Sequence, residues 1–289
     1  MSKIPLSVVV LTRDEEINLE ACLSSFDQLV DEIFIVDSGS TDRTVEIAEA
    51  HGATVVTHEF AGHSAQWRWA LENVPLRNAW VMGLDADQRM TAELATELRR
   101  VFRDGYPDHE VIGFYVARRN VFRGKWIRWG GYYPKYLLKL FRRDCVIHDE
   151  HDLLDHHFRV VGKTAKLQND IIEENRKEEK IDFWIQKHLQ YAELLAREEM
   201  RRSDGARNKL VDPRMRGTPD ERAEWLKKTW NKLPRFVRPA GYFVWRYFIR
   251  LGFLDGKEGF TFHFMHAFWY RLVADLKIDE LRRHARTGD

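Results

Sequence analysis

A continuous apolar run near the start of the chain, Leu6–Leu11 (LSVVVL), constrains the fold more than any other segment. It lacks the polar alternation of a half-exposed strand, so it predicts a strand buried on both faces, as in parallel sheets. Three further strand-like segments alternate with segments of helical spacing. The predicted strands are Glu32–Val36, Thr54–Val56 and Ala79–Leu84. The predicted helices are Ile17–Phe26, a segment capped at Ser40–Asp42 that runs to Ala50, Ala65–Leu71, and a segment capped by Thr91 that runs to about Phe102. This order predicts an α/β fold with a mostly parallel, Rossmann-like sheet and helices on both faces.

The rest of the chain is expected to change from mixed to helical structure. Two more strands, a loop rich in Gly and Trp, and four amphipathic helices are predicted. These are the strands Gly113–Ala117 and Tyr136–Phe141, the loop Arg123–Pro134 between them, and the helices Asp182–Glu199, Glu221–Asn231, Phe236–Leu251 and Phe260–Arg286. We therefore expect one domain at residues 1–200, a linker at 201–220 and a helical region at 221–289.

Composition and charge exclude several classes of protein. With 46 basic and 45 acidic side chains the net charge is +1, which argues against a strongly basic nucleic-acid-binding protein. The two cysteines, Cys22 and Cys145, lack metal-type spacing, so a reduced, cytoplasmic setting is the simpler expectation. The N-terminus lacks the apolar run of a signal peptide, and no run of about eighteen apolar residues suggests a membrane-spanning helix.

The sharpest chemical feature is Leu84-Asp85-Ala86-Asp87, directly after a predicted strand. Two carboxylates separated by one residue can hold a hard divalent cation that also binds substrate phosphates and water. In open α/β sheets, ligands bind at this end of the strands. The motif by itself also occurs in solvated turns, so its context decides between the two interpretations.

Two other predicted strands also end in polar residues. Asp37 follows the second strand and is suited to accept from a nucleobase N–H or ribose hydroxyls, while the turn after it opens a helix with free backbone N–H groups. Ser40 or Asp42 can equally cap that helix. The first strand ends in Thr12–Glu16, so three polar clusters are expected on one edge of the sheet.

Together these segments resemble a known family. Ser7–Asp14, Asp31–Thr44 and Trp80–Arg89 are similar to the donor-binding motifs of family 2 glycosyltransferases with the GT-A fold. The similarity continues through Arg119-Asn120, Gly124–Ile127, Gly130–Pro134 and Leu138–Arg142. The branch it resembles most comprises bacterial enzymes that build lipopolysaccharide cores and exopolysaccharides. Residues 1–105 would then form the nucleotide-sugar half of the domain and residues 106–200 the acceptor half.

The resemblance implies an inverting transfer of a sugar from a nucleotide-sugar donor, expected to be UDP-linked. Asp87 would ligate Mg²⁺ or Mn²⁺, with Asp85 near the ribose or the metal-bound diphosphate. A solvated helix face explains Arg68 as well as a phosphate contact does. The residues expected at the nucleotide-sugar are Thr12, Arg13, Glu15, Asp37, Ser40, Arg68 and Asp85.

An inverting transfer needs a base for the acceptor hydroxyl. The family has acidic residues where this chain has Ile147–Asp152, but here Asp149 is inserted between His148 and Glu150. Glu150 is the favoured base and Asp149 the alternative. This segment also contains four histidines: His148, His151, His156 and His157. They could bind a second metal, but solvated loop positions are the favoured interpretation.

Aromatic side chains mark the expected acceptor side. Trp126, Trp129, Tyr132 and Tyr133 can stack on sugar rings, or they can pack into the core. Thirteen aromatic residues also fall within 236–270, interleaved with arginines. Amphipathic helices of this kind suit an interfacial membrane contact, a helical subdomain packed on the rest of the protein, or an oligomer interface.

We therefore expect a glycosyltransferase that acts on a glycan or lipid-linked acceptor, with a peripheral contact at the inner face of the cytoplasmic membrane and a possible homo-oligomer. Two alternatives are an inactive assembly protein on the same fold and a sugar-phosphate nucleotidyltransferase. The second would need a glycine-rich loop after the first strand, where this chain has Thr12–Glu16. No nucleic-acid partner is expected.

Overall fold

The computed structural model describes residues 2–103, 107–147, 158–203 and 211–287. The chain divides into two compact units. The first comprises the described residues of 1–124, 134–150 and 155–177, and the second those of 125–133 and 178–289.

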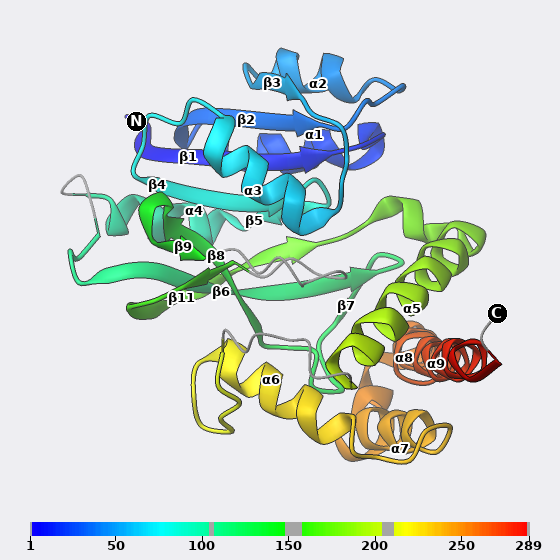
Figure 1. Cartoon of the computed structure of the whole chain (residues 1–289). Helices are drawn as coiled ribbons and strands as arrows, with labels where there is room; N and C mark the ends of the chain where they lie inside the picture. Colours follow the sequence, from blue (N-terminus) through cyan, green and yellow to red (C-terminus); the bar gives the residue numbers. More distant parts are fainter. Residues whose placement is uncertain (1, 104–106, 148–157, 204–210, 288–289) are drawn as a thin grey trace. The chain divides into compact units, whose positions relative to one another are not determined.

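The first unit is built on one mixed sheet (Figure 1). Its strand order is β3-β2-β1-β4-β8-β6-β11-β5. Pairs β1/β2, β2/β3, β1/β4 and β6/β11 are parallel, whereas β4/β8, β6/β8 and β5/β11 are antiparallel. The strands are β1 (Ile4–Thr12), β2 (Val30–Asp37), β3 (Thr54–Thr57), β4 (Trp80–Asp85), β5 (Gln88–Met90), β6 (Val111–Phe122), β8 (Lys135–Arg142) and β11 (Lys163–Glu173). A separate antiparallel pair joins β9 (Val146–Ile147) to β10 (Arg159–Val160).

Helices cover both faces of this sheet, as the apolar run in β1 predicts. Val8 and Val10 pack with α1 (Glu16–Ser24), α2 (Thr44–Ala50) and α4 (Ala92–Val101) in one core cluster. Val9 faces the other way and packs in a second cluster with Trp67 of α3 (His63–Asn73), which crosses the opposite face (Figure 1). Alternate side chains of one strand therefore enter two cores, which is why the segment contains no polar alternation.

The second unit is helical in the part that the structure describes, apart from β7 (Lys125–Ile127). Thr218 and Glu221 start α6 with a capping box, in which Glu221 N donates to Thr218 Oγ1 at 3.3 Å and Thr218 N donates to Glu221 Oε2 at 2.7 Å. Buried alanines lie where α5 packs on α9: Ala192, Ala196 and Ala274. The helices are α5 (Ile181–Ser203), α6 (Pro219–Trp230), α7 (Arg238–Val244), the π-helical η3 (Trp245–Ile249), the 3₁₀ turn η4 (Gly252–Asp255), α8 (Gly256–His263), the π-helical η5 (Phe264–Trp269) and α9 (Tyr270–Thr287).

The α/β fold with a helical C-terminal region is confirmed, but several boundaries differ from the predicted ones. Helix α2 begins at Thr44 because the preceding turn is held by side chains described below. Strand β11 was not predicted, since its sequence KTAKLQNDIIE is largely polar and becomes a strand by pairing with β6 and β5. The predicted final helix begins earlier, at Gly256, and contains the π-helical segment.

Neutral histidines are buried in the helical unit. His188 donates from Nδ1 to the carbonyl of Trp184 at 2.8 Å and stacks on the Trp184 ring. Burial lowers the pKa of His188 to about 4. Burial, followed by the nearby Arg246 charge, lowers the pKa of His263 to about 4. Both rings are therefore uncharged at neutral pH, and a proton on either would be buried without compensation.

We expect the helical unit to lose stability on mild acidification. A histidine whose folded pKa lies below its unfolded value stabilises the fold fully above about pH 6.5, and this stability falls as the pH drops toward 4. The loss at pH 5 should be about 2 kcal/mol for each ring. Urea unfolding between pH 7.5 and 5 checks this, since His188→Phe should flatten the slope. His109→Gln, at an exposed site in the first unit, is the matched control, and an equal slope in His188→Phe and wild type would contradict the assignment.

Candidate functional site

The ends of three parallel strands meet at one edge of the sheet. Thr12 pairs with Asp37 between β1 and β2, and Leu11 pairs with Asp85 between β1 and β4. The predicted Thr12, Asp37 and Asp85 are thus brought to neighbouring strand ends, and Asp87 lies two residues further along. This is the carboxyl edge of the sheet, where open α/β proteins bind their ligands.

The carboxylate of Asp37 organises the turn that follows it. One oxygen accepts from the Thr12 hydroxyl at 2.9 Å and from the Ser40 hydroxyl at 2.5 Å. The other accepts from the backbone N–H groups of Gly39 at 3.0 Å and Ser40 at 2.8 Å. Asp37 is almost fully buried, so these four bonds hold both the carboxylate and the loop rigidly. Its contact with a nucleotide stays a prediction.

The loop after β1 is locked to the loop after β2. Asp14 has a positive φ of 52° and accepts from Thr41 N at 2.8 Å, while its own N–H donates to the Ser40 hydroxyl at 2.8 Å. Ser40 therefore links Asp37 to Asp14 and does not cap α2. Asp42 instead accepts from Thr44 N, the first N–H group of α2, at 3.0 Å, and the N-cap residue itself is Arg43. The interlock presents the two loops as one preformed surface.

Glu15 anchors the same surface to the end of the first unit. Its carboxylate accepts from Lys177 Nζ at 2.6 Å and from Asn18 Nδ2 at 2.8 Å. The carbonyl oxygen of the Asn18 side chain in turn accepts from Arg176 N at 3.0 Å. Arg13, beside Glu15, is exposed at the sheet edge. Glu15 is thus engaged by protein partners, whereas Arg13 faces solvent.

A buried polar relay that was not predicted from the sequence lies behind the Asp37 turn. Gln66 on α3 is fully buried and donates to the Ser38 hydroxyl at 3.1 Å. Its side-chain oxygen faces His58 Nδ1 at 2.8 Å, and the His58 ring stacks on Trp69 with centroids 4.0 Å apart. A glutamine at a buried position of an amphipathic helix is the sequence signal for this relay. The predicted Arg68 is half-buried on the same helix.

Asp85 has a buried cationic partner that was not predicted from the sequence. Lys139, in the middle of β8, places Nζ 3.1 Å from Asp85 Oδ2. The Lys139 side chain is 9% exposed and that of Asp85 38% exposed, so the carboxylate lies between a buried charge and solvent. A buried ammonium requires such a partner. The available signal was a lysine within the otherwise apolar strand segment YLLKLF.

The turn that carries Asp87 is fixed by antiparallel strands. Gln88 Oε1 accepts from Asp85 N at 3.2 Å, and Gln88 Nε2 donates to Glu173 of β11 at 2.7 Å. The backbone carbonyl of Asp87 accepts from Glu174 N at 2.9 Å. Asp87 is itself half-buried beside a small hollow whose other lining residues are Asn18, Ala21, Cys22, Ala86, Gln88, Arg89, Glu174 and Arg176. Strands β5 and β11 thus determine where the Asp87 carboxylate lies.

The donor set suits a cation that arrives with phosphate. Within the described residues, no three His, Cys, Asp or Glu side chains converge as a self-sufficient metal site. Mg²⁺ needs no such cage, because one or two carboxylates with substrate phosphates and water complete its coordination. Cys22 is not a competing ligand, since burial and then the charges of Asp87 and Asp85 raise the pKa of its thiol well above the ordinary value. Asp85 and Asp87 therefore fit Mg²⁺ or Mn²⁺.

The predicted base lies outside the described residues. Glu150, its alternative Asp149, and the histidines considered for a second metal all fall within 148–157. Their roles stay predictions.

The predicted acceptor aromatics belong to the second unit, where Tyr132 packs against helical residues and Trp126 packs against Tyr133. Tyr132 lies between the Phe262 ring, 4.7 Å away, and the Arg246 guanidinium, 4.1 Å away. Trp126 and Tyr133 meet edge to face at 5.0 Å. Trp129 is the most exposed of the four. Core packing thus accounts for Tyr132, while Trp129 keeps an exposed surface for a ligand.

The loop bearing these aromatics is tied down by its backbone. Asp255 accepts from Arg128 N at 3.2 Å and from Trp129 N at 2.9 Å, and Gly130 N donates to the Arg250 carbonyl at 2.9 Å. Gly130 has φ +72°, and a Cβ there would overlap the His263 ring. Glycine is required at this position on both grounds.

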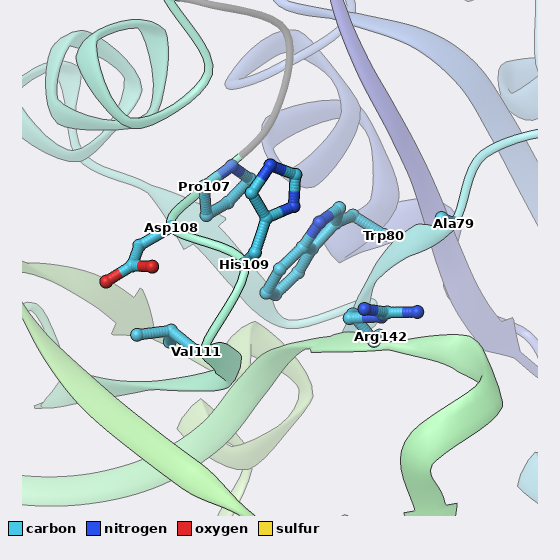
Figure 2. Close-up of a pocket in the computed structure, with 7 residues that line it drawn as sticks. All are labelled: Ala79, Trp80, Pro107, Asp108, His109, Val111 and Arg142. Carbon is cyan, nitrogen blue, oxygen red and sulfur yellow. The ribbon is translucent and has the colours of Figure 1, made fainter.

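A separate pocket of about 210 Å³ lies at the other edge of the sheet (Figure 2). Its lining residues include Trp80 at the start of β4 and Arg142 at the end of β8, and His109 lies beside the Trp80 ring (Figure 2). Because β4 runs from Trp80 to Asp85, this pocket and the Asp85–Asp87 site lie at opposite ends of that strand. It is not part of the candidate site.

Comparison with known proteins agrees with this geometry. Residues 7–161, more than half of the chain, match the model of glycosyl transferase family 2. An uncharacterized glycosyltransferase of Rickettsia bellii is 36% identical over 118 residues, covering 40% of this chain and 40% of that protein. The lipopolysaccharide core biosynthesis glycosyltransferase LpsC of Rhizobium meliloti is 30% identical over 151 residues, covering 49% of this chain and 52% of LpsC. The matched residues thus span about half of these relatives or less.

A solved structure shares the fold. The mannosyltransferase PcManGT from Pyrobaculum calidifontis, in complex with GDP-Man and Mn²⁺, aligns with a TM-score of 0.50, covering 96% of this chain and 88% of that protein. At 16% identity this likeness concerns the fold alone, and it agrees with the expected GT-A architecture. With the family match over residues 7–161, the chain belongs to glycosyl transferase family 2.

Proposed function

We propose that this protein is an inverting, metal-dependent glycosyltransferase that transfers a sugar from a nucleotide-sugar, expected to be UDP-linked, to a bacterial cell-surface glycan or glycolipid. The observation that carries the proposal is the alignment of the Asp37 turn with Asp85 and Asp87 at one sheet edge in a family 2 chain. The likeness to LpsC supports a lipopolysaccharide-core intermediate as the acceptor. An exopolysaccharide intermediate is the other acceptor that the family resemblance implies.

In this proposal, different residues of this edge bind the metal, orient the nucleotide and position Asp85. Asp87 and Asp85 would hold Mg²⁺ or Mn²⁺, which when bound with the diphosphate neutralises charge on the leaving group. The rigid loops around Asp37 and Asp14 orient the nucleotide without reorganising when it binds. Lys139 holds Asp85 in place through a charge-assisted hydrogen bond from a buried ammonium.

The acceptor side of the proposal follows the family resemblance. Glu150, or Asp149 in its place, would take the proton from the acceptor hydroxyl. Trp129 offers a stacking face for a sugar ring, with Trp126, Tyr132 and Tyr133 around it. We place residues 1–105 as the nucleotide-sugar half, 106–200 as the acceptor half and 201–220 as a linker, in a protein that works at the cytoplasmic face of the membrane and can assemble as a homo-oligomer.

Nucleotide binding tests the donor half of this proposal directly. Thermal unfolding of the full chain should be measured with UDP, GDP, dTDP and CMP, each with and without Mn²⁺. A ligand that binds only the folded state at about a hundred times its Kd stabilises by about 2.7 kcal/mol, which raises the melting temperature by several degrees. We expect a rise with UDP that requires Mn²⁺.

The panel also distinguishes between donors and tests the alternative of an inactive assembly protein. A rise in melting temperature with GDP and not with UDP would support the proposed donor site but show that the donor is a GDP-sugar. No rise with any nucleotide would contradict the transferase proposal and favour an inactive assembly protein on this fold.

A further inference from the structure

The helical unit carries a connected group of exposed aromatic side chains. Phe248, Phe253 and Phe260 are each about half exposed, with exposed fractions of 53%, 44% and 47%. All three contact the half-buried ring of Tyr247, at centroid distances of 5.1 to 6.3 Å. Phe264 stacks on Phe260 at 6.0 Å. We call this group the aromatic face; its members are Phe243, Tyr247, Phe248, Phe253, Phe260 and Phe264.

Further apolar side chains extend this surface along η3 and η4. Trp245 and Ile249, on η3 with Phe248, are 52% and 59% exposed. Leu254, next to Phe253, is 50% exposed. Scattered exposed apolar residues are normal, but a contiguous group of this kind marks a partner or a membrane. Among the described residues, no helix combines the length and the apolar character needed to cross a membrane.

The charges around the aromatic face favour one kind of partner. Residues 232–264 contain six Lys or Arg and two acidic residues. Arg250 and Lys257 are exposed, and Lys257 lies one turn before Phe260 on α8. Of the two acids, Asp255 is buried with its carboxylate bonded to backbone N–H groups, and Glu258 is half-buried. Apolar side chains bordered by cations, without an exposed acid among residues 232–264, match a surface of anionic lipid headgroups.

The same charges argue against a second copy of the chain as the occupant. A symmetric dimer would place the same patch of both copies face to face. The exposed charges of that patch, Arg250 and Lys257, are both cationic, so each copy would bring positive charge into the interface, and like charges brought together oppose association. A bilayer presents the opposite charge at its headgroups and an apolar interior beneath them.

We propose that the aromatic face, with Trp245, Ile249 and Leu254, docks the protein on the surface of an anionic phospholipid bilayer. The aromatic and aliphatic side chains enter the headgroup boundary, and Arg250 and Lys257 contact lipid phosphates. This binding needs no nucleotide, metal or acceptor, so it stands apart from the proposed transfer. Its failure would count against the membrane location in the proposed function and leave the proposed sugar transfer intact.

Vesicle co-sedimentation of the full chain tests the proposal. Phosphatidylcholine vesicles with about 30% phosphatidylglycerol should bind the wild type, and raising salt from about 0.1 to 0.5 M should weaken binding severalfold. Arg250→Glu/Lys257→Glu should weaken it tenfold or more, by about the loss expected for two basic groups near the surface. Arg222→Glu/Lys228→Glu, a charge reversal at exposed sites of α6, is the matched control and should bind more tightly than that variant.

The role of the apolar side chains is tested with a separate control variant and with tryptophan fluorescence from Trp245. Phe248→Ser/Phe260→Ser should abolish sedimentation, whereas Leu226→Ser, at a 52% exposed site on α6, should not. Lipids with brominated chains should quench the tryptophan emission of the wild type more strongly than that of Trp245→Phe. This readout does not depend on whether Phe248→Ser/Phe260→Ser folds. Absence of wild-type binding to anionic vesicles would overturn the proposal, as would a wild type that self-associates through Phe248 and leaves lipid unbound. Equal, salt-independent binding to neutral vesicles would overturn the role of the cations.

Discussion

Asp87→Asn should lower turnover of the nucleotide-sugar donor about a thousandfold, because in the proposed site it removes a carboxylate that binds the metal and with it several kcal/mol of charge stabilisation at the leaving diphosphate. The amide has nearly the same shape as the carboxylate. The backbone bond from Glu174 N to the Asp87 carbonyl, 2.9 Å long, does not involve the side chain and should persist. The turn should therefore keep its backbone position, and the loss should appear in kcat at saturating donor. Release of nucleoside diphosphate across a Mn²⁺ titration measures it.

A matched variant distinguishes this effect from a general change in charge. Asp108→Asn removes an exposed carboxylate that lines the pocket at the opposite edge of the sheet and should leave turnover unchanged (Figure 2). If Asp87→Asn retains wild-type turnover and the same Mn²⁺ dependence, Asp87 is not the metal ligand and the role assigned to this edge is wrong.

Asp275→Ala should destabilise the helical unit by about 3–5 kcal/mol, the cost of leaving a buried charge without its partner. Asp275 on α9 is fully buried and accepts from Arg238 Nε at 2.8 Å and from Phe236 N at 2.8 Å. Phe236 has a positive φ of 64°, so the same carboxylate also holds the turn before α7. Burial alone would lower the pKa of Arg238, but its hydrogen bonds to Asp275 and Glu199 raise it, so its charge persists.

Urea unfolding with hydrogen exchange at α7 and α9 measures the loss. Asp279→Ala is the matched control, because Asp279 pairs with the largely exposed Arg283 on the same helix and such pairs contribute only a few tenths of a kcal/mol. Arg238→Met/Asp275→Leu should restore part of the stability, since an apolar pair replaces the buried ions, while Glu199 and the Phe236 N–H each lose one partner. A single variant as stable as the Asp279→Ala control would show that the buried pair contributes nothing net.

The sequence alone predicted the parallel part of the sheet and the position of its functional edge. Leu6–Leu11 is apolar on both faces because both faces of β1 are covered, a local property that the residue order displays directly. Thr12, Asp37 and Asp85 follow directly from where those strands end. The same local signals placed Thr91 as the cap of α4, which its hydroxyl confirms by accepting from Leu94 N at 3.1 Å.

Only the tertiary structure revealed what surrounds these residues. Lys139 is 54 positions from Asp85 along the chain, and only the antiparallel pairing of β8 with β4 brings them together. The polar strand β11 forms because it pairs with β6 and β5, and the His263 ring faces Gly130 because α8 packs against that loop. The alternation of buried and exposed side chains can be read from neighbouring residues in the sequence, whereas the partner of a charged side chain depends on contacts between distant segments. For this protein, therefore, sequence determined the family, the sheet edge and its carboxylates, and packing decided which side chains hold them in place.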